Sequence, residues 1–258
     1  MSDYFRLRQI ALAAHDLPKV IDDFQYIFGV NLAFQDEHVA KYGLENALFP
    51  FGLAFIEVVA PFKEDTAAGR FIERSGGVGG YMAIFNCSDP ERRGEHAAAM
   101  GVPVAHAMEY ESFVGVQLHP RACRATMIEF DHTPGEANPM GPYFPAGGDG
   151  WQGAVKTDVT RSIREIIVES PVPDELGAFW GRLLEKPWRP EGDGGRIDDV
   201  DMIGVRIAKA PEGGRECLRT VVVESNDPHG TVSRAAERGF IVRDGGFDMC
   251  GVRFEITP

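Results

Sequence analysis

Few of the residues that could do chemistry stand in a recognised spacing. The four cysteines share a wide separation without any Cys-x-x-Cys pair: Cys87, Cys123, Cys217 and Cys250. This pattern predicts small buried thiols rather than a zinc site or a disulfide framework. No serine stands in a nucleophile-elbow motif with histidine and aspartate partners, so covalent hydrolysis is not indicated. The glycine-rich run Glu191–Gly195 lacks the strand-then-helix setting of a phosphate loop and predicts a turn.

Charge and composition narrow the function classes further. The 258 residues include 26 Lys plus Arg against 39 Asp plus Glu, a net charge of −13, with no basic run. Such a field repels nucleic acids and anionic membrane surfaces. The apolar runs are too short to cross a bilayer, and the N-terminus has no basic stretch followed by an apolar one. We therefore expect a cytoplasmic globular protein.

A stretch dense in proline and glycine, Thr133–Gly153, divides the chain. These residues disfavour both helices and central strands. We predict a first domain over residues 1–134, a linker over 135–154 and a second domain over 155–258.

An order of elements recurs along the chain. Strand-like residues Leu7–Ala14 precede a helix that begins at Asp16 and ends at Gly29, with Pro18 in its first turn. Three strand-like pieces follow, at residues 30–36, 47–50 and 52–60. The same βαβββ order returns over residues 80–131, and the second half repeats it in weaker form. The order predicts an α+β fold built from tandem modules.

Two strand-like runs carry a family resemblance. The run Gly115–Ala122 followed by Met127–Phe130 resembles the last two strands of the vicinal oxygen chelate superfamily, which includes glyoxalase I, methylmalonyl-CoA epimerase, extradiol dioxygenases and drug-resistance proteins. Leu7–Leu17 resembles its first strand and helix start, and Phe55–Pro61 the fourth strand. The resemblance covers about residues 5–134 and is looser afterwards. It implies two cupped mixed-sheet domains of paired βαβββ modules, with a divalent metal in the cup.

The resemblance also implies which residues meet in the cup. The family places a ligand on the first and fourth strands of each module, which corresponds to Gln9 and Glu57, then to Met82 and Glu129. The separations, 48 and 47 residues, support this register. A metal held by Gln9, Glu57 and Glu129 would suit hard cations, but Met82 replaces the usual histidine and a thioether is a poor ligand for them. A one-residue slip would place Tyr81 there.

Three interpretations of this cup stay open. We expect either no cofactor or a weakly held divalent cation of the Mg²⁺, Mn²⁺ or Zn²⁺ class, which would assist enolisation. Without metal, Glu57 and Glu129 would face each other, and one raised pKa would create an acid–base pair. The third interpretation is a binding pocket without chemistry. We predict an isomerase or lyase that moves a proton next to a carbonyl; the alternative is a metal-free sequestration protein.

The remaining polar residues are assigned smaller roles. His119 is a candidate for substrate positioning with Gln9, Tyr81 and Met82, whereas Arg121 is expected in solvent. We expect His132 on the face opposite Glu129, and we find no partner pattern for two other histidines, His38 and His106.

The equivalent positions of the second half are Arg164, Ile207, Thr220 and Arg253, which cannot hold a cation. We expect the arginines to pair with surface carboxylates, namely Glu165, Asp248 and Glu255. This half is expected to close the cup or to mediate a homodimer. The partner is expected to be a small apolar or carbonyl-bearing substrate.

Overall fold

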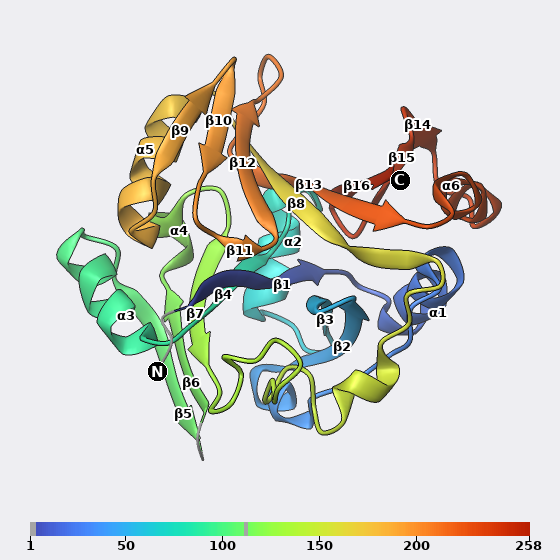
Figure 1. Ribbon diagram of the computed structural model, residues 1–258, viewed down its shortest axis with the longest axis horizontal. Helices are drawn as coiled ribbons and strands as arrows, with labels where there is room; N and C mark the ends of the chain where they lie inside the picture. The colour runs from blue at the N-terminus through green and yellow to red at the C-terminus, as the bar shows by residue number, and fades with distance from the viewer. Residues whose placement is uncertain (1–3, 111–112) are drawn as a thin grey trace.

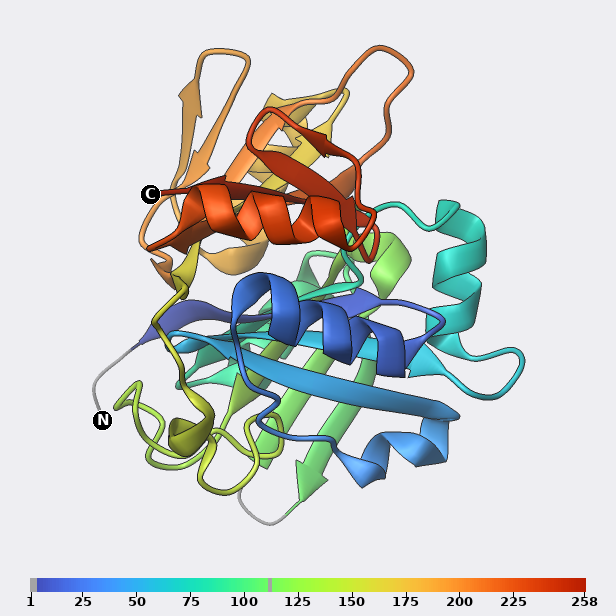
Figure 2. The ribbon, with the colours of Figure 1, turned by 90° about the vertical axis from the view of Figure 1, so that its right-hand side faces the viewer.

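The computed structural model describes residues 4–110 and 113–258, and within them the chain forms two eight-stranded mixed β-sheets. The sheets lie one above the other, with the first half of the chain in one layer and the second half in the other (Figure 2). This arrangement confirms the predicted α+β fold of tandem modules.

The first sheet has the order β2-β3-β1-β4-β7-β6-β5, and β11 pairs with the N-terminal part of β1, at Arg6 and Leu7. Its strands are β1 (Phe5–Ala13), β2 (Leu44–Phe51), β3 (Ala54–Pro61), β4 (Met82–Cys87), β5 (Val104–Tyr110), β6 (Phe113–Leu118), β7 (Met127–His132) and β11 (Asp201–Met202). The antiparallel pair β1 and β4 joins the two modules at the centre. Figure 1 shows that the strands of this sheet curve rather than lie in one plane.

Equivalent residues of the two modules hold the same register. Gln9 of β1 lies opposite Phe55 of the parallel strand β3, and Met82 of β4 lies opposite Met127 of the parallel strand β7. Glu57 and Glu129 each follow their paired residue by two positions and therefore share its face of the sheet. The register thus gives the two glutamates matching places in the two modules.

The second sheet repeats the paired modules in the order β14-β15-β16-β13-β8-β12-β10-β9. Its strands are β8 (Thr160–Ser170), β9 (Trp188–Glu191), β10 (Gly194–Ile197), β12 (Gly204–Lys209), β13 (Cys217–Ser225), β14 (Val242–Arg243), β15 (Gly246–Met249) and β16 (Val252–Thr257). Glu191–Gly195 forms the tight connection between β9 and β10, which confirms the predicted turn.

Helices and short 3-10 turns connect the strands. They are α1 (Leu17–Phe28), η1 (Glu37–Tyr42), α2 (Ala67–Ser75), α3 (Pro90–Ala99), α4 (Pro120–Cys123), η2 (Trp151–Ala154), α5 (Pro173–Leu184) and α6 (Pro228–Glu237). The predicted ends of α1 are confirmed, because the Asp16 side chain accepts from the Lys19 amide and Gly29 adopts φ 66°. Sequence reasoning predicted neither η1 nor α2.

The strand predicted over residues 30–36 is wrong. Only Phe34 forms a β-bridge there, to Leu48. The chain leaves the sheet because the Asp36 carboxylate accepts from the His38 amide and starts η1. This cap starts η1 beside the cavity described below, and it brings His38 into the lining of that cavity.

The two halves share one hydrophobic core. Helix α1 packs against α6 between the sheets (Figure 2), and its Phe28 ring lies 5.0 Å from the Phe254 ring and 5.8 Å from the Phe247 ring. Full burial of each such ring stabilises the fold by about 1.5–3 kcal/mol. The first sheet is therefore braced by the second half of the chain.

The Pro/Gly-rich connection between the halves packs on the first sheet. We call residues 133–154 the strap. Its Tyr143 and Trp151 are both 1% exposed, and their rings lie 5.0 and 5.1 Å from the Phe55 ring of β3. The strap therefore packs on this sheet as well as joining the two halves.

The cysteines are free thiols, as predicted: Cys87, Cys123 and Cys217 are buried and Cys250 is partly buried. In the part of the chain that the structure describes, every helix is too short or too polar to cross a membrane.

Candidate functional site in the first cup

A cavity of about 390 Å³ lies on the concave side of the first sheet. We call it the cup. Gln9, Glu57, Tyr81, Met82 and Glu129 all line it, so the structure brings together five of the six residues predicted to form the site. His119 does not line the cup, because it is exposed at the start of α4.

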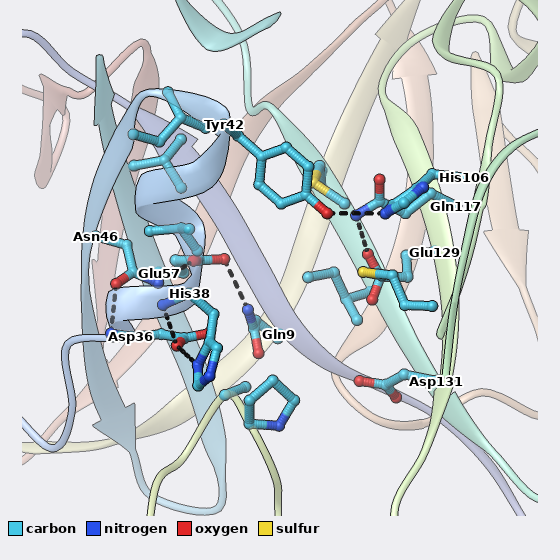
Figure 3. Close-up of a pocket in the computed structure, with 18 of the residues that line it drawn as sticks. Gln9, Asp36, His38, Tyr42, Asn46, Glu57, His106, Gln117, Glu129 and Asp131 are labelled. Atoms are coloured by element: carbon cyan, nitrogen blue, oxygen red, sulfur yellow. Dashed lines mark hydrogen bonds and ion pairs between the residues drawn. The ribbon is translucent and has the colours of Figure 1, made fainter. Parts of the chain in front are cut away.

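Glu57 projects from β3 into the cup and has both carboxylate oxygens occupied. Gln9 Nε2 donates to Oε2 at 2.9 Å, and Asn46 Nδ2 donates to Oε1 at 2.7 Å (Figure 3). Burial raises the pKa of Glu57, and the hydrogen bonds from Asn46 and Gln9 oppose that rise because they favour the ionised form.

Glu129 projects from β7 on the facing wall. Its surroundings stabilise a carboxylate charge less than those of Glu57. It is 5% exposed and accepts a hydrogen bond from Gln117, whose Nε2 lies 2.8 Å from Oε2. Burial, followed by the neighbouring Asp131 carboxylate, raises the pKa of Glu129 to about 8. This shift favours the protonated form of Glu129 near neutral pH.

The two glutamates are unequal although their backbone positions match. Two amide donors favour the Glu57 carboxylate, whereas one favours that of Glu129. Hydrogen bonding therefore favours the ionised form more strongly at Glu57 than at Glu129. The cup thus presents two carboxyl groups with different hydrogen bonding on different walls (Figure 3).

Gln9 links this pair to the strap. The Tyr143 hydroxyl donates to Gln9 Oε1 at 3.0 Å, so the Gln9 amide nitrogen is turned toward Glu57. Sequence reasoning missed Tyr143, because no local sequence pattern predicts its contact with Gln9, which is 134 positions away. The strap thereby sets the orientation of the group that stabilises the Glu57 carboxylate.

The donor set does not fit the divalent cation that the family resemblance implies. The Gln9 oxygen is engaged by Tyr143 and its NH₂ group points at Glu57, where a cation would be repelled. Met82 supplies a thioether within an apolar patch with Ala11 and Ile84. Among the described residues, no group of three His, Cys, Asp or Glu side chains is placed to hold a metal.

Two histidines at the mouth were underestimated from sequence. His38 and His106 both line the cup. Asp36 Oδ1 lies 2.8 Å from His38 Nδ1, and the Tyr42 hydroxyl lies 2.9 Å from His106 Nε2 (Figure 3). The expectation that they carry no partner pattern is wrong. The Asp36–Glu37–His38 order was an available signal, because a capping aspartate brings a histidine two residues later close to itself.

The apolar lining comes from both modules and from the strap. Tyr81 packs against Phe71 with ring centroids 5.1 Å apart, and burial raises the pKa of Tyr81 to about 12, so its hydroxyl stays protonated. Met82, Met108 and Met127 lie on the walls. The cup therefore combines flexible apolar walls with a small set of polar groups, which is the usual composition of a small-molecule site.

Other predicted polar residues lie away from the cup. His132 is outside the lining, as expected, and contacts the Tyr4 hydroxyl at 2.8 Å, while Arg121 is exposed. In the second half Arg164 lies 3.5 Å from Glu165. Arg253 instead donates to the main-chain oxygens of Arg243 and Asp244, so its predicted pairing with a carboxylate is wrong.

Behind the cup lies a second polar cluster. Asp131 lines the cup and accepts from Asn86 Nδ2 at 3.0 Å, and burial and then Glu136 raise its pKa to about 7. The Arg8 guanidinium is fully buried and lies 4.0 Å from the Tyr143 ring centroid. This cluster anchors the strap to β1 and explains why a charged side chain is tolerated there.

Comparison with known proteins agrees with this architecture. A family model described as a glyoxalase-like domain matches residues 10–184. No protein of curated function matches the chain in sequence. A hypothetical protein from Staphylococcus aureus has 14% identity over 98% of this chain and 99% of its own, with a TM-score of 0.66, so the whole two-sheet arrangement recurs in another protein.

Smaller solved structures align with half of the chain. A Streptomyces coelicolor methylmalonyl-CoA epimerase variant in complex with 2-nitronate-propionyl-CoA has 19% identity over 52% of this chain and 99% of its own, with a TM-score of 0.45. The Mycobacterium tuberculosis methylmalonyl-CoA epimerase has 20% identity over 51% and 90%, also with a TM-score of 0.45. The family model, by contrast, spans more than half of the chain. The chain belongs to the glyoxalase-like domain family and has the tandem fold of the vicinal oxygen chelate superfamily.

Proposed function

We propose that the cup catalyses proton transfer at a carbon atom next to a carbonyl group, as an isomerase or a lyase. The observation that carries this proposal is the pair of glutamates on facing walls with unequal hydrogen bonding. Glu57 acts as the general base and Glu129 as the general acid. An ionised and a protonated carboxyl group in one enclosed site is the arrangement that acid–base catalysis requires.

The reaction follows from the protonation states. The Glu57 carboxylate accepts the proton from the α-carbon. The electron pair of the broken C–H bond forms a double bond to the carbonyl carbon, and the π pair of the C=O bond moves to the oxygen. The Glu129 acid donates its proton to the carbonyl oxygen, which gives a neutral enol. In the second half Glu129 takes back the enol proton as the C=O bond re-forms. Protonation of the α-carbon on its opposite face gives an isomer, whereas departure of a leaving group from the β-carbon, with the proton held by Glu57, gives an alkene and makes the reaction a lyase step. Such general acid–base assistance contributes about 10²–10⁴-fold to a rate.

The proposed reaction uses no metal ion. In this proposal the Glu129 proton stabilises the oxygen on which negative charge develops, which is the task that a cation would otherwise perform. Support comes from the Gln9 amide, whose oxygen accepts from Tyr143 while its NH₂ group donates to Glu57. Gln9 is a positioning residue that holds the base in its ionised form.

The test is exchange of α-protons for deuterium, followed by NMR. The protein in D₂O is mixed with a panel of small aryl and hydroxy ketones and aldehydes. We expect exchange with at least one panel member, reduced at least about 100-fold in Glu57→Gln and in Glu129→Gln. Glu45→Gln is the matched control, because Glu45 is exposed on β2 and lies outside the cup lining.

The same experiment separates the enzyme from a sequestration protein. Binding of panel members to the wild-type protein without α-proton exchange in any of them would contradict catalysis and favour binding alone. Binding that survives Glu57→Gln while exchange is abolished supports the catalytic role.

A further inference from the structure

The charged side chains that line the cup are nearly all acidic. Four carboxyl groups line it, from Asp36, Glu57, Glu129 and Asp131. Lys41 is the only lysine or arginine among the described lining residues, and it is exposed at the mouth with its Nζ 4.9 Å from the Tyr42 ring centroid. Among the described lining residues, the floor of the cup therefore has no lysine or arginine to balance its acids.

The buried arginines near the cup lie outside its lining, and from there Arg8 lowers the pKa of Asp131 against the effect of burial. Arg8 Nη2 donates to the Pro139 main-chain oxygen at 2.9 Å, and its guanidinium lies against the Tyr143 ring. Arg6 donates to the Glu136 main-chain oxygen at 3.0 Å. Neither arginine lines the cavity, so neither is placed to pair with a ligand carboxylate.

The floor also has little capacity to donate hydrogen bonds to an anion. Two amide groups, those of Gln9 and Asn46, already donate to Glu57, and Gln117 donates to Glu129. A ligand carboxylate could accept one hydrogen bond from the Glu129 acid, but it would lie in a desolvated space beside the other acids without a cation to pair with, which is unfavourable. A carbonyl oxygen needs only one donor, and the Glu129 acid supplies one.

We infer that the cup selects against anions, and that its substrate is an uncharged carbonyl compound with an apolar body. The methionine and aromatic walls accept the body, and the acidic floor excludes a carboxylate or phosphate at the reacting end. This inference rests on the proposed function, which identifies the cup as the substrate site. The preference for uncharged ligands over anions, which we call the charge rule, is a property of binding and is measured without turnover.

The experiment compares two ligands of nearly equal shape, 3-phenylpropionamide and 3-phenylpropionate, on the full chain labelled with ¹³C at the methionine methyl groups. Met82, Met108 and Met127 line the cup, whereas Met140 and Met202 do not, so the methyl shifts report where a ligand binds. We expect the amide to shift the three cup methyls with a dissociation constant at least about tenfold lower than that of the carboxylate. Equal or tighter binding of the carboxylate overturns the inference, and so does the absence of cup shifts with both ligands.

A charge-removing variant tests the cause. Glu57→Gln should narrow the preference for the amide, because it removes the carboxylate that stays ionised in the floor. Glu45→Gln removes one exposed charge on β2 and should leave the preference unchanged. If both variants behave like the wild-type protein, the acidic floor is not the source of the selectivity and the inference fails. Amide preference without α-proton exchange would instead refute the proposed reaction and leave the charge rule standing.

Discussion

Glu129→Gln should make the protein less sensitive to alkaline pH. Burial and Asp131 raise the pKa of Glu129 from the usual value of 4.5 to about 8, so between these values the folded protein binds a proton that the unfolded chain does not. The stability from this group is fully present below about pH 4.5 and is lost as the pH rises through about 8. At about 1.4 kcal/mol per pH unit, the loss between about pH 5 and about pH 9 is on the order of 4 kcal/mol.

Glutamine keeps the size of the side chain and an oxygen that can accept from Gln117, but it does not ionise. Urea unfolding at several pH values should therefore show the wild-type free energy of unfolding falling more steeply than that of Glu129→Gln. Asp131 titrates in both proteins, so its contribution largely cancels in the comparison.

A matched surface variant controls for the lost charge. Glu73 is exposed on α2, and Glu73→Gln should keep the wild-type pH dependence within about 0.5 kcal/mol. If wild-type protein and Glu129→Gln lose stability in parallel between about pH 5 and about pH 9, Glu129 is not protonated in the folded protein, and the acid of the proposed mechanism is lost.

Three further predictions address the strap and the metal. Tyr143→Phe removes the hydroxyl that donates to Gln9 while keeping the ring against Phe55, so we expect about 1 kcal/mol lower stability in urea and slower α-proton exchange; unchanged exchange would show that Gln9 needs no such support. Trp151→Ala empties a fully packed position and should cost about 3–5 kcal/mol by the same measurement, whereas Gln152→Ala should cost less than about 1 kcal/mol; equal losses would contradict the role of the strap. Treatment with EDTA should leave α-proton exchange unchanged, and a loss that Mg²⁺, Mn²⁺ or Zn²⁺ restores would contradict the metal-free proposal.

Local signals carried most of the fold prediction. Asp16, Pro18 and Gly29 mark the ends of α1 through capping and backbone preferences that depend on neighbouring residues only. The strand predicted over 30–36 failed for a local reason too, because the capping role of Asp36 outweighed the strand-like composition before it. Helix α2 was missed although its Thr66 cap and Gly76 end are visible in the sequence.

The site was predictable only as far as the register of the strands. Once the family resemblance aligned the two modules, Gln9, Glu57 and Glu129 fell on the correct faces, because side chains alternate along a strand. Tyr143 could not be found in this way, since its place depends on how the strap crosses the sheet. The inequality of the two glutamates likewise depends on which amides reach them, which is set by packing between distant strands.

The most direct test of the account is an NMR pH titration of the two cup glutamates, with ¹³C in their side-chain carboxyl groups and assignment through Glu57→Gln and Glu129→Gln. The proposed acid–base mechanism predicts that Glu129 titrates near pH 8 and Glu57 at lower pH, so that a base and an acid face each other at neutral pH. Titration of both groups together, in the range of exposed glutamates near about pH 4.3, would contradict it.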